Sequence, residues 1–343
     1  MSNSLQRSKA LFALGDHLRH YNSEDNTCSS LKAAIDKALI LNGWFTQNSV
    51  EMAIQNWGEA LQEQKLSQWV SQYPLSEAKT THTIALILAG NLPLVGLHDV
   101  LCVWLCGYHA LVKCASKDTA LLPYIAHFLE KETGENRIEF TTEVLTGFDA
   151  VIATGTNNSA RYFDHYFSKY PHIIRKNRNG VAVLSGKETN EELEGLGHDI
   201  LDFFGLGCRN VSKLYLPKGF DLNSIFGGLY PLSDCINHPK YANNYDYNKA
   251  VFLMSDFSFL ENGFMILREE EAMSAPIACV HYQYYDSLEQ LSLQLKADQD
   301  LIQCLISHFP LDGAIPFGTA QQPHLWEYAD GIDTLDFLLK LSS

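Results

Sequence analysis

Between residues 83 and 156, short apolar runs alternate with longer segments of helical spacing. The runs TIALILAGN, HALVKCAS, RIEFTTE and FDAVIATGT predict short strands, and the first two are apolar enough to be buried on both faces. Between them, LPLVGLHDVLCVWLCG and TALLPYIAHFLEKETG predict helices, the first with Pro93 in its first turn. This alternation is typical of a doubly wound α/β sheet, which binds ligands at the carboxyl ends of its strands.

The rest of the chain predicts helices on the N-terminal side and a second α/β region on the C-terminal side. Apolar residues over 1–72 recur every three or four positions, which predicts helices. SARYFDHYFSKY predicts another helix, and RKNRNGVAVLSG predicts two extended segments joined by an Asn-Gly turn. Residues 186–206 predict a helix with Leu193, Leu196, Ile200, Leu201 and Phe204 on its apolar side. We therefore expect two domains, residues 1–185 and residues 186–343.

Charge and composition exclude several classes of protein. The net charge of −15 argues against a nucleic-acid or anionic-membrane partner, because such surfaces need clustered Lys and Arg. The most hydrophobic stretch, residues 84–112, is too interrupted for a membrane span, which needs roughly 20 apolar residues. The N-terminus lacks a signal-peptide core, and the eight cysteines show neither metal-ligand spacing nor a disulfide framework. These features predict a cytoplasmic protein without a metal site.

Cys208 is the strongest candidate for a reactive side chain. It lies in DFFGLGCRNVSKLYLP, at a glycine-rich junction between a predicted helix and a strand. The neighbouring Arg209 and free backbone N–H groups would favour the thiolate, which is the reactive form. The alternative is a buried structural cysteine, the interpretation that suits Cys102, Cys106, Cys114 and Cys279. Cys235, on loop-like sequence, is the one competitor.

Polar or small residues follow the predicted strands of the first sheet. Asn91 comes directly after the first strand, where its amide could donate to an oxyanion, and a helix N-cap is the alternative role. The ends of the second and fourth strands suit a ribose, a phosphate or a close backbone approach. These residues are Lys113, Ser116, Lys117, Thr154, Gly155 and Thr156. Taken singly, each also fits an ordinary solvated strand end.

Taken in order, these segments resemble the aldehyde-dehydrogenase superfamily, and more closely its acyl-CoA reductase branch, which includes the fatty-acid reductase component of bacterial bioluminescence. The resemblance runs from about residue 80 to the end of the chain. It rests on LAGNLPLVGLHDVL, CGYHALVKCASKD, VIATGT, FFGLGCRNVSKLYLP and AIPFGTAQQPHLWEYADGIDTLDFL, of which the last two are the most specific. The chain lacks the GxGxxG dinucleotide fingerprint, so a cofactor would be held without it.

The resemblance implies a fold and a reaction. It implies an aldehyde-dehydrogenase-like α/β architecture, with a doubly wound NAD(P)-binding domain and an α/β catalytic domain. Cys208 would be the nucleophile, Asn91 an oxyanion donor beside the Cys208 N–H, and Lys113 a ribose contact. The implied activity is NAD(P)H-dependent reduction of an acyl-CoA to an aldehyde through an acyl-cysteine, with release of coenzyme A. Relatives of this fold commonly form dimers or tetramers, and an acyl-transferring partner protein is a further alternative.

Two departures from the family pattern refine this expectation. The Glu-Leu-Gly-Gly-Lys run that carries the water-activating Glu of the dehydrogenases appears here as RKNRNGVAVLSGK, without a Glu. Its absence favours transfer to or from coenzyme A over hydrolysis. Lys113 and Lys117 flank the position of the usual acidic ribose ligand, which favours NADPH, with NADH as the alternative. The acidic contact to the nicotinamide ribose would fall near Glu270 or Glu271, but their spacing from Pro276 does not fit cleanly, so this role stays open.

Two other functions compete with acyl-CoA reduction. One is an aldehyde dehydrogenase that oxidises aldehydes to acids. The other is a non-catalytic homologue that acts as an acyl-transfer partner subunit, because a fold does not guarantee a function.

Overall fold

The computed structural model describes residues 3–22, 29–75, 81–155 and 157–341. The chain forms two compact units: unit 1 is Met1–Lys176 with His324–Ser343, and unit 2 is Asn177–Pro323. The division therefore lies at 176/177 where the sequence suggested 185, and the C-terminal tail, expected in the second domain, belongs to unit 1. The reason is pairing and packing: β6 (Asn179–Val183) joins the sheet of unit 2, and α12 (Thr334–Lys340) packs on α5 of unit 1.

Four helices open unit 1, as the spacing over 1–72 predicted for the part of it that the structure describes. Leu11, Leu14, Leu18 and Ile35 are fully buried and contribute to one large core. The Thr46 side chain caps the third helix, with Ser49 returning the bond in a capping box. The helices are α1 (Asn3–Arg19), α2 (Ser29–Leu41), α3 (Gln47–Ala60) and α4 (Glu63–Val70).

The predicted alternation of strands and helices is confirmed in a five-stranded parallel sheet of order β3-β2-β1-β4-β5. Its strands are β1 (Thr83–Ile87), β2 (His109–Lys113), β3 (Ile138–Phe140), β4 (Ala150–Thr154) and β5 (His172–Arg175). The crossover helices are α5 (Leu97–Leu105), α6 (Leu121–Thr133) and α7 (Asn157–Phe167). The order reverses between β1 and β4, and this reversal marks the ligand-binding point of doubly wound sheets.

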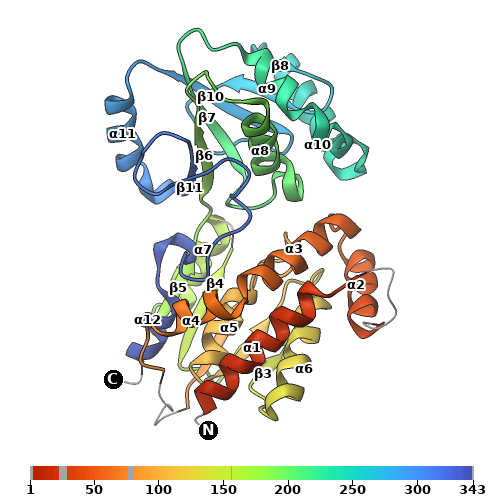
Figure 1. Ribbon diagram of the computed structural model, residues 1–343, viewed down its shortest axis with the longest axis vertical. Helices are drawn as coiled ribbons and strands as arrows, with labels where there is room; N and C mark the ends of the chain where they lie inside the picture. The colour runs from red at the N-terminus through yellow and green to blue at the C-terminus, as the bar shows by residue number, and fades with distance from the viewer. Residues whose placement is uncertain (1–2, 23–28, 76–80, 156, 342–343) are drawn as a thin grey trace. The chain divides into compact units, whose positions relative to one another are not determined.

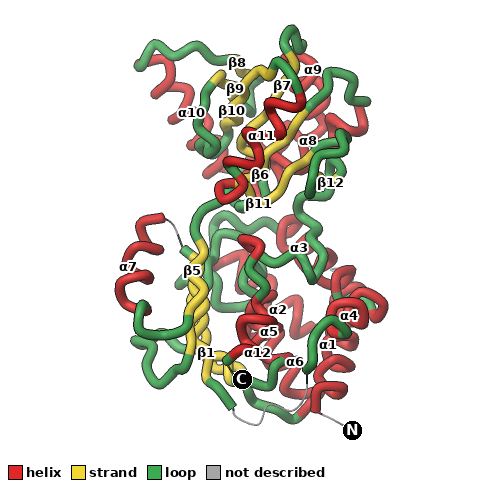
Figure 2. Tube along the Cα trace, turned by 90° about the vertical axis from the view of Figure 1, so that its left-hand side faces the viewer, coloured by secondary structure: helices red, strands yellow, loops and turns green. Residues whose placement is uncertain are grey.

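The two faces of this sheet are covered differently. Ile84 and Leu86 of β1 face the large core formed with α1 to α6 and α12, whereas Ala85 faces a smaller cluster that includes Phe163 and Phe167 of α7. Figure 2 shows α7 alone on one side of the sheet and the other helices of unit 1 on the opposite side. Alternate residues of a strand point to opposite faces, so a strand buried on both must be apolar throughout. This explains the uninterrupted run TIALI.

The helix after β1 begins later than predicted. Pro93 lies in a turn before the helix, Leu94 has a left-handed backbone (φ 58°), and Gly96 is the N-cap of α5. A left-handed residue cannot continue a right-handed helix, so the helix starts only at Leu97. The prediction of Pro93 in the first helical turn is therefore wrong. The alternative role of Asn91 as the N-cap of this helix is wrong for the same reason.

Unit 2 is built around a seven-stranded sheet of order β12-β11-β6-β7-β10-β9-β8, parallel except for β8. In Figure 1, α11 (Leu288–Ala297) lies on one face, and α8 (Asn190–Leu201), α9 (Leu222–Leu229) and α10 (Pro239–Met254) lie on the other. The further strands are β7 (Val211–Pro217), β8 (Leu260–Glu261), β9 (Ile266–Glu269), β10 (Cys279–Tyr285), β11 (Ile302–Ile306) and β12 (Ala314–Ile315).

The predicted Asn-Gly turn is absent from the structure. Asn179 and Gly180 open β6, which pairs with β7 and β11, whereas β5 belongs to the sheet of unit 1. Gly180 is required for a different reason, because a Cβ there would lie 2.6 Å from the carbonyl oxygens of Arg209 and Asn210. The glycine therefore permits a close approach of two backbones, a role that sequence spacing does not distinguish from a turn.

Candidate active site

Cys208 is the one exposed cysteine among the seven that the structure describes. It lies between the 3-10 turn η2 (Asp202–Gly205) and β7. Burial raises the pKa of Cys235, the competitor on loop-like sequence, to about 11. Burial also raises the pKa to about 12 in Cys106, Cys114 and Cys279. Such thiols are almost entirely protonated at neutral pH, which disfavours them as nucleophiles, and its exposure favours Cys208 as the reactive one.

The side chain of Asn210, which is 3% exposed, holds the loop that carries Cys208. Its Oδ1 accepts a hydrogen bond from the Gly207 N–H at 2.8 Å. Its Nδ2 donates at 2.8 to 3.3 Å to the carbonyls of Asp199, Ile200 and Asp202. The last carbonyls of a helix lack partners within the helix. Asn210 therefore caps α8 and ties the Cys208 loop to its end.

The turn before Cys208 is strained. Phe203 and Phe204 both have left-handed backbones, with φ of 54° and 60°, and Gly205 follows with φ of 71°. The left-handed region costs a non-glycine residue about 1–2 kcal/mol. The Phe204 ring packs 4.4 Å from the His238 ring, centroid to centroid. The predicted helix over 186–206 thus ends at Leu201, because these residues reverse the chain toward Cys208.

The predicted cofactor residues gather at one edge of the sheet of unit 1. Because its five strands are parallel, their carboxyl ends share an edge. Asn91 follows β1, the segment from Lys113 to Lys117 ends β2, and Thr154 with Gly155 ends β4. Thr156 lies outside the described residues. Asn91 belongs to unit 1 and Cys208 to unit 2.

Two features at this edge suit a phosphate-bearing ligand. Gly155 separates β4 from α7, and a Cβ there would lie 2.9 Å from both Ser159 Cβ and Phe163 Cε2. The glycine lets α7 begin close against the strand, and the N-terminus of a helix after such a strand favours anions. Lys113 Nζ donates to the Glu143 carbonyl at 3.0 Å, while Ser116 and Lys117 are exposed.

Asp118, which was not predicted as a site residue, is a buried carboxylate at the same edge. It is 2% exposed, and its Oδ1 has no hydrogen-bond partner among the described residues. Its Cβ lies 3.1 Å from the position that a Cβ on Gly90 would take. Burial raises the pKa of Asp118 to about 6. An unpaired buried oxygen carries a desolvation cost, which protonation of the acid reduces.

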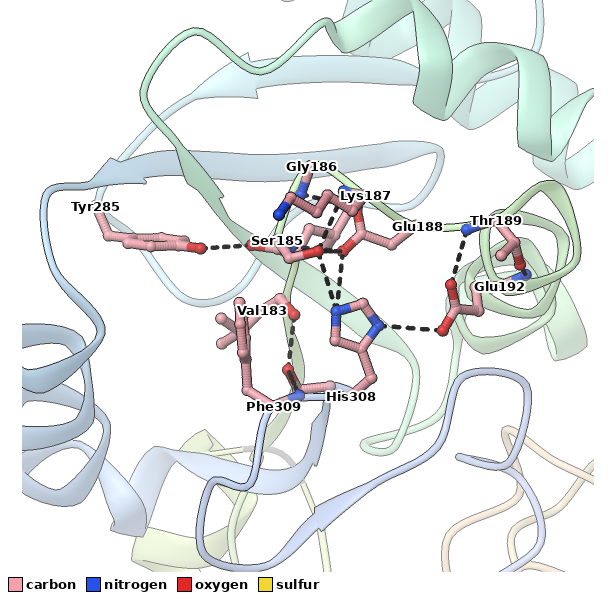
Figure 3. A network of polar contacts seen from close by, with 12 residues as sticks. Val183, Ser185, Gly186, Lys187, Glu188, Thr189, Glu192, Tyr285, His308 and Phe309 are labelled. Carbon is pink, nitrogen blue, oxygen red and sulfur yellow. Dashed lines mark hydrogen bonds and ion pairs between the residues drawn. The ribbon is translucent and has the colours of Figure 1, made fainter.

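Glu188, one residue beyond the segment that lacks the catalytic Glu, lies at the opposite end of β6 from Cys208. Its carboxylate accepts hydrogen bonds from the Ser185 hydroxyl (2.8 Å) and from the backbone N–H groups of Ser185 and Gly186, as Figure 3 shows. The Cys208 loop, by contrast, contacts Gly180 at the start of β6. A strand rises about 3.3 Å per residue, so roughly 15 Å separates Glu188 from the Cys208 loop, which is too far for Glu188 to activate water at Cys208.

Figure 3 also shows a second cluster of reactive residue types. His308 Nε2 lies 3.0 Å from Ser185 Oγ, and His308 Nδ1 lies 3.1 Å from Glu192 Oε1, the spacing of a serine-nucleophile triad. The Glu188 carboxylate, however, occupies the Ser185 and Gly186 N–H groups that an oxyanion would need, and it would repel an alkoxide at Ser185. The cluster is therefore a structural network of hydrogen bonds that links the end of β6, α8 and the end of β11.

The acidic segment after β9 is fixed by its own neighbours. Glu270 pairs with Arg268 (2.8 Å) and accepts a hydrogen bond from the Glu271 N–H (2.9 Å), whereas Glu271 is exposed. The Glu270 carbonyl accepts from the fully buried Lys213, whose pKa burial lowers to about 8. Neither Lys213 nor Asp199 was singled out from the sequence. Asp199 carried a signal, because it is a charged residue among Leu196 and Ile200 on the apolar side of a predicted helix.

No protein-family model matches the sequence, and no curated protein matches it. Solved structures do match. P. syringae indole-3-acetaldehyde dehydrogenase AldA, solved with NAD+ and IAA, aligns over 85% of this chain and 69% of its own, with TM-score 0.62 and 12% identity. A NAD-dependent aldehyde dehydrogenase from Sinorhizobium meliloti aligns over 90% and 71%, with TM-score 0.63 and 12% identity. The NAD+ complex of a Bacillus cereus aldehyde dehydrogenase aligns over 86% of this chain and 69% of its own, with TM-score 0.58 and 13% identity.

At such low identity, this likeness establishes the fold. The chain has the aldehyde-dehydrogenase fold, with one parallel α/β unit of doubly wound order and a second, mostly parallel α/β unit. The fold class predicted from the sequence is confirmed.

Two negative findings apply to the part of the chain that the structure describes. No group of three or more His, Cys, Asp or Glu side chains is arranged to hold a metal ion there. Within the same residues, none of the helices has the length and apolarity needed to cross a membrane.

Proposed function

We propose that this chain is an NAD(P)H-dependent acyl-CoA reductase. In the proposed reaction an acyl-CoA, NAD(P)H and a proton give an aldehyde, coenzyme A and NAD(P)+. The observation that carries the proposal is the exposed Cys208 on a braced glycine-rich loop, within an aldehyde-dehydrogenase fold whose described thiols are otherwise partly or fully buried.

The first half-reaction uses residues of this chain alone. The Cys208 thiolate attacks the thioester carbonyl, forming the new C–S bond, and the thiolate of coenzyme A leaves as the tetrahedral species collapses. By the family resemblance, the Asn91 amide and the Cys208 N–H would stabilise the oxyanion, for which hydrogen-bond donors are worth several kcal/mol each, about 3 in measured cases. The product of this step is an acyl-cysteine.

The second half-reaction requires a nicotinamide cofactor, which supplies the two electrons that reduce the thioester. Unit 1 would hold it through Lys113, Ser116, Lys117, Thr154, Gly155 and Thr156. The close start of α7 behind Gly155 suits a pyrophosphate. Lys113 and Lys117 at the ribose end suit the 2′-phosphate of NADPH, with NADH as the alternative. Cys208 then leaves the reduced carbon as a thiolate, and the aldehyde is released.

The departure from the dehydrogenase motif supports reduction over acid formation. Residues 175–187 contain no Glu, and Glu188 lies at the far end of β6, bound to Ser185 and Gly186. Without a Glu at the motif position to activate water, the acyl-cysteine would survive long enough to be reduced or returned to coenzyme A.

The proposed chemistry also implies where the chain works and with what. A catalytic thiolate must stay reduced, which suits the cytosol. Acyl-CoA and coenzyme A would be its small-molecule partners. A homo-oligomer or an acyl-transferring partner protein would be identified by co-purification.

The test is loss of NADPH absorbance on adding acyl-CoAs of increasing chain length, with NADH in parallel. We expect turnover, its abolition in Cys208→Ala, and its retention in the matched control Cys235→Ala. Most of the activity persisting in Cys208→Ala would overturn the assignment of the nucleophile. Acid formation from an aldehyde without coenzyme A would instead support the dehydrogenase, and no turnover would support the non-catalytic partner subunit.

A further inference from the structure

The backbone N–H and the backbone carbonyl of Ala320 are each held by a charged side chain of unit 2. Its N–H donates to Asp199 Oδ1 at 2.9 Å, and its carbonyl accepts from Arg209 Nε. The neighbouring Gly318 N–H donates to Asp199 Oδ2 at 2.7 Å. One carboxylate on α8 and one guanidinium beside Cys208 thus grip the same short segment.

Arg209 connects this segment directly to the nucleophile, because it follows Cys208 in the chain. Its carbonyl also accepts from the Cys304 thiol of β11 at 3.3 Å. The backbone immediately after Cys208 is therefore attached to β11 on one side and to the Gly318–Ala320 segment on the other. Through that segment, Arg209 is attached to Asp199.

Asp199 is an unusual residue for its position. It is 1% exposed on the apolar side of α8, where a charged group is costly unless it is paired. The two N–H groups are its compensation. The segment can reach Asp199 because Gly195 has no side chain: a Cβ there would lie 3.1 Å from the Gly318 nitrogen. The arrangement thus requires Gly195, Asp199 and the segment together.

We propose that Asp199 is a positioning residue for Cys208, and that its protonation loosens the Gly318–Ala320 segment and lowers the reactivity of the thiol. This inference rests on the proposed function, in which Cys208 is the nucleophile. Asp199 acts through Ala320 and Arg209 and does not touch the substrate.

The groups around Asp199 place this response in the mildly acidic range. Burial, the largest cause, raises its pKa to about 6, while the Gly318 and Ala320 N–H groups oppose the rise. Asp202 raises the pKa further and His198 lowers it, both from the same end of α8. Arg209 faces the segment from the Cys208 loop, and residues 316–320 carry no charged side chain.

Protonation has opposite effects on the segment and on overall stability. A protonated Asp199 keeps one good acceptor for the Gly318 and Ala320 N–H groups. The contacts between Asp199 and the Gly318–Ala320 segment, which form the brace, therefore weaken below pH 6. Because the folded pKa is raised above its unfolded value, the folded state binds the proton more tightly between about pH 4 and pH 6. The free energy of unfolding from this group therefore rises as pH falls. A loss of activity between pH 6 and pH 4 would therefore not come from a loss of stability through Asp199.

The experiment measures Cys208 alkylation by iodoacetamide from pH 5 to 8, quantified by mass spectrometry of its peptide, in the full chain and in Asp199→Asn. We expect the ratio of variant to wild-type rates to lie below one above pH 6 and to approach one below it. In the reductase assay, kcat should fall by about ten-fold or more while the KM for NADPH is unchanged, as for a misplaced nucleophile. Glu194→Gln, an exposed acid on α8, is the matched control and should match wild type.

A constant ratio of one across this pH range would overturn the proposal. If Asp199→Asn fails to fold, Arg209→Met removes the hydrogen bond from Arg209 to the Ala320 carbonyl, and alkylation should slow. Arg209→Lys keeps a donor at this position and should partly restore the alkylation rate. Identical alkylation in all three proteins would likewise overturn the proposal. Because alkylation needs no turnover, an inactive but normally alkylated wild type would count against the proposed reductase and leave the brace standing.

Discussion

His98 and Asp99 are neighbours on α5, and each contacts one of the two segments that connect unit 1 with unit 2. Asp99 contacts the segment by which the chain leaves unit 1, and His98 contacts the segment by which it returns. His98 Nε2 lies 2.8 Å from the Leu325 carbonyl, just after the chain returns, and Asp99 pairs with Arg175 at the end of β5. Arg175 also donates to Thr334 of α12 at 2.9 Å. One turn of α5 therefore fixes the last strand of the sheet and the returning C-terminal segment.

Breaking the buried Asp99–Arg175 pair should destabilise unit 1 strongly. The side chains are 4% and 7% exposed, so removing one partner leaves an uncompensated buried charge, which costs about 3–5 kcal/mol. We expect Arg175→Met to lower the free energy of unfolding by this amount in urea denaturation. Lys176→Met, at the exposed next residue, is the control. An equal, small change in both variants would show that the pair contributes little.

Replacing Asp118 by Asn should stabilise the protein above pH 6. The raised pKa of about 6 means that folding favours the protonated acid, so this group's contribution falls as pH rises from about 4 to 6 and is flat above. Asn removes that slope, with a gain of at most about 3 kcal/mol at pH 7.5 and little at pH 4. Urea midpoints at both pH values measure it, with the exposed Glu139→Gln as control. A gain that is the same at both pH values would contradict a titrating Asp118.

Adding a side chain at Gly155 should weaken cofactor binding. The Cβ of Gly155→Ala would lie 2.9 Å from Ser159 Cβ and Phe163 Cε2, so α7 must shift away from β4. If the start of α7 holds the pyrophosphate, we expect the Kd for NADPH to rise by roughly ten-fold, about 1.4 kcal/mol. Fluorescence titration measures it. Gly227→Ala, in a helix with nothing within 4 Å of its Cβ, should bind as wild type, and equal affinity of both variants would move the cofactor elsewhere.

Asn210→Ala should remove activity more than stability. It deletes four hydrogen bonds at the end of α8, and we expect about 1–3 kcal/mol from the carbonyls and N–H left unpaired. The Gly207 N–H is released next to Cys208, so kcat should fall by about a hundred-fold. The exposed Asn243→Ala is the control. Circular dichroism with the reductase assay separates the two effects, and a fully active Asn210→Ala would show that the loop needs no brace.

Local patterns in the sequence predicted the elements that tertiary contacts did not alter. The run TIALI becomes β1 because every residue of a doubly covered strand must be apolar, and Gly134 ends α6 with a left-handed backbone (φ 73°). Cys208 was identified from its neighbours Gly207 and Arg209, and its exposure supports that choice. These signals lie within a few residues of one another.

Contacts between distant residues decided the rest. Gly180 resembles a turn glycine in the sequence, but the close approach of the Arg209–Asn210 backbone places it in β6. The left-handed backbone of Leu94 delays the start of α5, and the leucine side chain gives no sequence signal for it. The unit boundary and the return of the tail depend on sheet pairing and on partners as distant as Tyr73 and Asp333, whose side chains share a 2.7 Å hydrogen bond. The sequence by itself determined the alternating elements and singled out the segment around Cys208 as the candidate nucleophile, because periodicity and turn chemistry are local. Only the tertiary structure decided that Asp199, Ala320 and Arg209 form one brace, because a buried charge gains its partners through folding.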